Sequence, residues 1–344
     1  MLSVYRLAIY GSGEALAMEK NKQLMWCYLM HLGYNMWHSA DSHLDTKYGK
    51  ASTVLRFDLD AWNAIIDKLA ASGFNTVVLD LGEGVKYESH PEIAAQGAWS
   101  IDFLRSELNK LRAKGITPIP KLNFATTHDE WLGEYSRRVC TPEYYQVCRD
   151  LIEEVCDVFD QPEFFHLGMD EEFTENQIHL HYAVIRQFDL WWHDMYFYIE
   201  ACERKNVRAA VWSDCGKKNI AEYVAKMPKS VLQTNWYYWN YWDDVQADYI
   251  GMDAFQYNEK QIQGYKTHLD LFPALEKAGF EQIPSGSFWN NDVNFYNLTR
   301  YAQKLISPER LRGFMQTAWL PTVNETLSEH FRCIDVAAKA INKD

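Results

Sequence analysis

Residues 164–172 read FFHLGMDEE, and this stretch decides the fold predicted for the chain. Its first four residues are largely apolar and end at Gly168, a pattern typical of a short buried strand. Three consecutive carboxylates, Asp170, Glu171 and Glu172, follow one residue later. A strand of a parallel barrel delivers the residues at its end to the face that carries the site. We therefore expect these acids at the mouth of a barrel, with a solvated acidic loop as the alternative.

Strand-like and helix-like segments alternate along the rest of the chain. The strand-like segments are 23–31, 75–81, 116–122, 164–167, 207–213, 230–237, 280–288 and 311–319. The helix-like segments that follow them are 59–72, 100–114, 141–159, 175–205, 219–226, 269–278, 295–305 and 324–341. Repeated strand–helix order implies a parallel sheet, and eight pairs favour an α/β fold of the (β/α)8 TIM barrel type over an open doubly wound sheet. The absence of GxGxxG after the first strand also weakens a dinucleotide-binding fold.

Residue types at the segment ends predict several boundaries. Asp58 or Asp60 is the expected N-cap of the first helix, Ser100 that of the second, and Thr141 that of the third, where a proline follows. The segment 238–263 is long and rich in Trp, Tyr and Asp. We expect it to form a βα loop over the barrel mouth.

The composition limits the classes of partner. The net charge is −13, which disfavours nucleic acid and anionic membrane surfaces because both require a basic surface. Hydrophobic residues make up 47%, enough for a large core, yet no apolar run is long enough to span a membrane. Many of the 13 Trp and 21 Tyr are expected in the core, but such rings also stack on the apolar faces of sugars.

We expect residues 1–22 to form an N-terminal extension and residues 23–344 a single catalytic barrel domain. Residues 1–18 hold a broken apolar patch that is a poor match to an export signal. The seven cysteines lack a CxxC pattern and suggest reduced thiols and a cytoplasmic location, with a periplasmic or secreted location as the alternative. No zinc-site spacing is present, so neither a metal nor another cofactor is expected. The expected partner is a carbohydrate, and a homodimer is a compatible assembly.

Residues that directly follow the predicted strands form the candidate site, because barrel strands point their ends at one face. Carboxylates, indoles and amides dominate this group, which suits a neutral polyhydroxylated ring rather than a phosphate. The catalytic candidates are Asp170 and Glu171. The candidates for substrate binding are Asn35, Glu83, His128, His166, Trp212, Asp214, Trp236, Tyr237, Trp289 and Trp319. The other strand-end residues include Trp37, Asn123, Tyr238 and Trp239.

Asp170 and Glu171 suit the two roles that glycoside cleavage requires. One protonated acid must give its proton to the leaving oxygen. We predict that Glu171 is this acid, because burial and a neighbouring negative charge would both raise its pKa. Asp170 would then stay ionised and stabilise developing positive charge.

HLGMDEE at 166–172 resembles the His-x-Gly-Gly-Asp-Glu signature of glycoside hydrolase family 20, the β-N-acetylhexosaminidases. Weaker similarities follow the same barrel order. KGITPIPKLNFATTH at 114–128 is similar to the third-strand segment of the family, and VWSD at 211–214 to the fifth. QTNW at 233–236 resembles the sixth, and GFMQTAW at 313–319 the eighth. The similarity spans roughly residues 24–325.

The resemblance implies a divergent, barrel-only relative with a substrate-assisted retaining mechanism. The 2-acetamido oxygen of the substrate would attack the anomeric carbon. Asp170 would orient that amide, and Glu171 would act as general acid and then as base. The indoles of Trp212, Trp236 and Trp319 would surround the acetamido group and the sugar ring.

Several positions depart from the family pattern. Met169 replaces the second glycine, Lys121 stands where the family has glutamate, and residues 126–128 replace Pro-Gly-His. The arginine after the first strand and the tyrosine of the seventh strand are absent. Because that tyrosine holds the acetamido carbonyl, Tyr237 or Tyr238 would have to take its place.

Three alternative functions remain open. The first is a glycosidase of other specificity, with Glu171 as acid and Asp214 or Glu83 as nucleophile; a separation of about 5–5.5 Å between the two carboxyl groups would favour it. The second is a non-catalytic glycan-binding barrel. The third is a metal-dependent sugar isomerase.

Overall fold

The computed structural model describes residues 23–44 and 46–342, so the extension predicted at 1–22 lies outside the described residues. Its centre is a sheet of eight parallel strands, one at each position predicted from the sequence. These strands are β1 (Met25–His31), β2 (Thr76–Asp80), β5 (Thr117–Lys121), β6 (Phe164–His166), β7 (Arg208–Val211), β8 (Leu232–Gln233), β9 (Ser285–Ser287) and β10 (Gly313–Thr317). The parallel α/β architecture is therefore confirmed.

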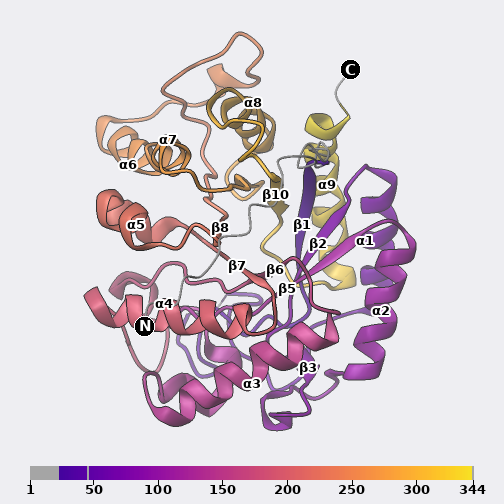
Figure 1. Cartoon of the computed structure of the whole chain (residues 1–344). Coiled ribbons are helices and arrows are strands. Elements are labelled where there is room, and N and C mark those ends of the chain that lie inside the picture. The colour runs from indigo at the N-terminus through magenta and orange to yellow at the C-terminus, as the bar shows by residue number, and fades with distance from the viewer. Residues whose placement is uncertain (1–22, 45, 343–344) are drawn as a thin grey trace, which may run out of the picture.

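Helices lie around the outside of the sheet, with α1 and α2 on one side and α5, α6 and α7 on the other (Figure 1). Ser100 and Thr141 cap α2 and α3 through their side chains, as predicted. Asp58 precedes α1, but its carboxylate accepts the backbone N–H of Asn324 instead. The helices are α1 (Leu59–Ala71), α2 (Ile101–Ala113), α3 (Pro142–Val158), α4 (Phe188–Glu203), α5 (Ile220–Lys226), α6 (Glu259–Leu269), α7 (Leu271–Lys277), α8 (Asn294–Leu305) and α9 (Leu327–Ile341).

The strand order is β8-β7-β6-β5-β2-β1-β10-β9, so the sheet curls until β10 pairs with β1, and β8 and β9 form its two edges. Isolated parallel bridges connect Gln233 with Gln282 and Trp236 with Ser285. A separate two-stranded sheet, β3 (Val85–Lys86) and β4 (Trp99–Ser100), was not predicted. No helix in the described part of the chain is both long and apolar enough to cross a membrane.

The helix predicted at 175–205 begins only at Phe188, so the prediction is wrong for residues 175–187. Side-chain contacts hold the preceding segment as a loop. Gln177 exchanges hydrogen bonds with the backbone of Val184, and Arg186 is drawn into a buried ion pair. Such tertiary contacts override helix propensity. The loop predicted at 238–263 gives way to α6 at Glu259.

An apolar layer fills the inside of the curled sheet. Side chains along a strand alternate between its two faces, so in β1 Cys27 and Leu29 point inward while Tyr28 and Met30 pack against the helices. The inner cluster contains Cys27, Leu29, Val78, Ile119, Phe164, Ala210, Trp212, Leu232, Ile283 and Met315.

A polar layer lies above this apolar layer, toward the carboxyl ends of the strands. Two residues after Val78 and Ile119, the same strand faces carry Asp80 and Lys121, which form a buried ion pair. His31 lies 3.5 Å from the Asp80 carboxylate. Burial disfavours a charged Asp80, but Lys121 and His31 outweigh this effect and lower its pKa.

We expect the Lys121→Met variant to lose about 3–5 kcal/mol of unfolding free energy, because it leaves the Asp80 charge buried without its main partner. The double variant Lys121→Met, Asp80→Leu removes both charges and is expected to recover most of this loss. Urea unfolding of the wild type, both single variants and the double variant measures the coupling. Additive effects of the two substitutions would contradict the predicted ion pair.

Candidate active site

The carboxyl ends of the strands open into a cavity of about 640 Å³. Aromatic side chains provide much of its wall, and a small polar group lies at one side. The aromatic residues are Tyr34, Trp37, Tyr48, Trp236, Tyr238, Trp239, Trp289 and Trp319. The polar group consists of Asn123, His128, Asp170 and Glu171. The cavity therefore combines surfaces for ring stacking with two carboxylates.

The backbone after β6 adopts an uncommon conformation that shapes this site. Gly168, Met169 and Glu171 all have left-handed φ values, of 71°, 71° and 56°. For residues with a side chain this conformation costs roughly 1–2 kcal/mol each. The glycine is required, since an added Cβ at 168 would lie 1.9 Å from Oδ1 of Asn123.

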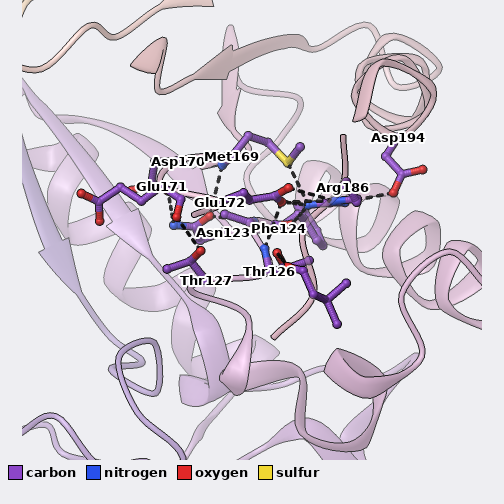
Figure 2. A network of polar contacts seen from close by, with 12 residues as sticks. Asn123, Phe124, Thr126, Thr127, Met169, Asp170, Glu171, Glu172, Arg186 and Asp194 are labelled. Atoms are coloured by element: carbon purple, nitrogen blue, oxygen red, sulfur yellow. Dashed lines mark hydrogen bonds and ion pairs between the residues drawn. The ribbon is translucent and has the colours of Figure 1, made fainter. Parts of the chain in front are cut away.

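Asn123, which follows β5, holds this turn from one side (Figure 2). Its Oδ1 accepts the backbone N–H groups of Ala125 and Met169, at 3.0 and 3.2 Å. Its Nδ2 donates to Oδ1 of Asp170 at 2.8 Å. The Thr127 hydroxyl adds a bond to the carbonyl of Glu171 at 2.7 Å. Side chains from the neighbouring strand end thus fix both the strained backbone and the first carboxylate.

Glu172 anchors the far end of the turn. It forms a buried ion pair with Arg186, which also donates to Asp194 at 3.0 Å and to the carbonyl of Phe124 at 2.7 Å (Figure 2). The backbone N–H of Thr126 donates to Glu172 at 3.1 Å. Glu172 is therefore saturated by structural contacts, in agreement with its exclusion from the candidate list.

His128 brings the two catalytic candidates together. Its Nε2 lies 3.3 Å from Oε2 of Glu171 and 3.5 Å from Oδ2 of Asp170. Its Nδ1 donates to the carbonyl of Met36 at 3.0 Å, which fixes the ring orientation. Burial disfavours an imidazolium, but the two carboxylates outweigh it and raise the pKa of His128 to about 9.

The pKa order predicted for the two acids is wrong. Burial raises the pKa of Asp170, and the neighbouring Glu171 adds to this effect. Burial also acts on Glu171, but the hydrogen bond from His128 and its charge outweigh it and lower the pKa. The sequence could not show this, because His128 arrives from another strand end.

Asp214, which follows β7, supports Glu171 from behind. Its Oδ2 accepts the backbone N–H of Glu171 at 3.0 Å. Burial raises the pKa of Asp214 to about 6, while the Lys217 ammonium opposes this rise. Lys217 itself lies 3.9 Å from the centre of the Trp236 ring and donates to His268 at 2.9 Å. The sequence had not singled out this lysine.

The structure brings six of the predicted residues to the cavity: His128, Asp170, Glu171, Trp236, Trp289 and Trp319. His166 and Trp212 do not line it, because both are buried inside the sheet, where Trp212 is part of the apolar inner cluster. There His166 contacts the Thr234 hydroxyl at 2.8 Å, and its ring lies 4.5 Å from that of Trp212. Their predicted contact with substrate is thus not matched by a position in the cavity lining.

Three further candidates are also displaced from the cavity. Asn35 and Glu83 hold the loop after β1: Glu83 accepts the backbone N–H groups of Tyr34 and Asn35 at 2.8 and 3.1 Å, and Asn35 bonds the backbone of Ser52. The hydroxyl of Tyr237 donates to the carbonyl of Tyr241, away from the cavity.

Tyr238, rather than Tyr237, supplies the hydroxyl on this side of the cavity. Its ring stacks on Trp236 with centroids 5.0 Å apart, and its oxygen accepts the indole N–H of Trp319 at 3.2 Å. Its own hydroxyl proton therefore stays available to a ligand. The sequence had identified Tyr238 and Trp37 as residues at strand ends. Nothing in the sequence indicated that residues 46–49 would form part of the cavity wall.

Gly168→Ala is expected to destabilise the protein by about 1–3 kcal/mol more than Gly115→Ala. Both glycines have similar φ values, 71° and 75°, but a Cβ at 115 meets nothing within 4 Å. The Gly115 variant thus measures the cost of the left-handed backbone, about 1–2 kcal/mol, and the difference measures displacement of Asn123. Thermal and urea unfolding give both values; equal losses would contradict the close approach.

The comparisons with known proteins concern the fold. No protein-family model matches the sequence, and no curated protein matches it. Solved structures with a similar fold are β-N-acetylhexosaminidases, including members of glycoside hydrolase family 20. The fold thus agrees with the divergent family-20 resemblance predicted from the motif.

Three of these structures illustrate the extent of the likeness. The Streptomyces plicatus N-acetyl-β-hexosaminidase has a TM-score of 0.62 at 12% identity, over 94% of this chain and 66% of that chain. The Flavobacterium johnsoniae chitobiase has 0.61 at 15%, over 93% and 48%. The Bacteroides fragilis β-N-acetylhexosaminidase has 0.54 at 13%, over 90% and 65%. The chain thus spans about half to two thirds of the length of these proteins.

Proposed function

We propose that this chain is a glycoside hydrolase related to family 20, with the activity of an exo-β-N-acetylhexosaminidase. The observation that carries the proposal is the placement of the Asp170 and Glu171 carboxylates within 3.5 Å of one imidazole, at the wall of an aromatic cavity. The proposal includes completion of the curled sheet as a (β/α)8 barrel, supported by the bridges between the segments around β8 and β9.

In the proposed reaction the substrate supplies its own nucleophile, the oxygen of its 2-acetamido group. Asp170, held by Asn123, would orient this amide and stabilise the positive charge that develops on it. Glu171 would protonate the leaving oxygen and then activate water. The lowered pKa of Glu171 belongs to the free site, where His128 is its partner; a glycosidic oxygen would take the place of that contact.

A different enzyme nucleophile fits the contacts less well. Asp214 accepts the backbone N–H of Glu171, and Glu83 accepts two backbone N–H groups of the β1 loop. Both carboxylates are buried, and each has an oxygen bound by these backbone groups. Asp170 is the carboxylate that faces the cavity beside Glu171.

Tyr238 is proposed to hold the acetamido carbonyl. Its hydroxyl lines the cavity and retains a free proton after accepting the Trp319 indole N–H. Burial raises the pKa of this phenol, so its proton is kept. In this way Tyr238 would replace the tyrosine that the seventh strand lacks.

The wild type is expected to hydrolyse 4-nitrophenyl N-acetyl-β-glucosaminide or its galacto epimer. Glu171→Gln should lower kcat/KM by about 10²–10⁴-fold on a disaccharide and less on the aryl glycoside, because the phenol leaves without much protonation. Glu175→Gln, an exposed site on the same loop, is the matched control. Binding of sugars without cleavage of any glycoside in a panel would favour the glycan-binding alternative.

Tyr238→Phe is expected to lower kcat/KM on N-acetyl substrates by roughly 10–100-fold, the equivalent of a hydrogen bond worth about 1.5–3 kcal/mol. Tyr237→Phe removes the same atom from the neighbouring residue and should change kcat/KM less than twofold. Steady-state kinetics on 2-acetamido and 2-hydroxy glycosides provides the comparison. An equal effect of Tyr238→Phe on both substrate classes would contradict the role proposed for its hydroxyl.

A further inference from the structure

The group formed by His128, Asp170 and Glu171 is, among the described residues, the one set of three His, Cys, Asp or Glu side chains placed to share a metal ion. Their ligand atoms lie within 4.8 Å of one another, and all three side chains line the cavity. We propose that this group binds a divalent transition-metal ion, with zinc as the best match, between the imidazole nitrogen and the two carboxylates. The sequence had predicted no metal site.

The spacing of His128 from each carboxylate suits a tetrahedral ion. Zinc bonds to nitrogen and carboxylate oxygen are about 2.0–2.2 Å long, which places neighbouring ligand atoms of a tetrahedron roughly 3.3–3.6 Å apart. The Nε2 atom of His128 lies 3.3 Å from Oε2 of Glu171 and 3.5 Å from Oδ2 of Asp170. These two edges therefore fit without moving the imidazole.

The surrounding contacts leave one ligand atom free on His128 and one on Asp170. Nδ1 of His128 donates to the Met36 carbonyl, so Nε2 carries the lone pair once its proton is displaced. Asn123 occupies Oδ1 of Asp170 and leaves Oδ2, the oxygen that faces His128. Partners that orient ligands from behind in this way are typical of metal centres.

The charge of the three side chains and their exposure to the cavity also suit a divalent metal ion. A neutral imidazole and two carboxylates carry a charge of −2, which a divalent ion neutralises. Three protein ligands and one position open to a cavity form the usual arrangement of a zinc site that binds water or a small anion. The same side chains would thus hold either a sugar or an ion, and the ion would act as a competitor of the sugar.

Isothermal titration of chelator-treated protein with ZnCl2, in the absence of sugar, tests the proposal. We expect one ion per chain, and with Co²⁺ the intense visible absorption of a four-coordinate site. His128→Gln and Asp170→Asn should each weaken binding by about 100-fold or more, beyond the 10–100-fold expected for Asn123→Ala, which removes an outer contact.

The matched control is His181→Gln, because His181 forms a comparable His–carboxylate pair with Asp41 at the surface. Its affinity for zinc should equal that of the wild type. Absence of saturable binding to the wild type, or unchanged binding in both His128→Gln and Asp170→Asn, would overturn the proposal. These outcomes are independent of whether the chain cleaves glycosides, because the readout contains no substrate.

Discussion

The left-handed turn at Gly168, Met169 and Glu171 is the constraint on which the site depends. In an extended strand, neighbouring side chains point to opposite faces, so Asp170 and Glu171 would separate. The turn allows both carboxylates to meet one imidazole. Its conformational cost is offset by Asn123, Thr127 and the buried ion pair of Glu172, and strain of this kind is commonly stored where a site needs an exact geometry.

Inside the curled sheet, the side chains change from apolar to polar along the strands toward this site. The layer of Leu29, Val78 and Ile119 is apolar, the next layer carries His31, Asp80 and Lys121, and the cavity begins above it. Charges in the polar layer are paired before they reach the cavity. The carboxylates of the site have His128 as their ion-pair partner.

The sequence was informative where local pattern and tertiary structure agree. The apolar run at 75–81 predicted a strand, and Ser100 and Thr141 predicted helix caps. The catalytic candidates Asp170 and Glu171 were recognised because they follow a short strand. It was less informative where the chain leaves regular structure. Whether Tyr237 or Tyr238 faces the cavity depends on a one-residue alternation that cannot be counted through an irregular strand end.

Other features depend on partners that are distant in the sequence. Residues 175–187 have helical character, but Arg186 is pulled toward Glu172, so α4 starts late. Glu83 and Asn35 look like site residues because they follow strands, yet the backbone of the β1 loop requires their polar atoms. The acidity of Glu171 likewise follows from His128, 43 positions earlier.

The junction between β8 and β9 gives the molecule a seam. Here the two edge segments are connected by isolated bridges at Gln233 and Trp236 together with backbone hydrogen bonds. The backbone N–H groups of Gln233, Ile283, Ser285 and Tyr237 each donate to a carbonyl of the facing segment, at 2.9 to 3.1 Å. Trp236 lies on the seam and also lines the cavity, so a residue that joins the two edge segments of the sheet is also part of the cavity wall.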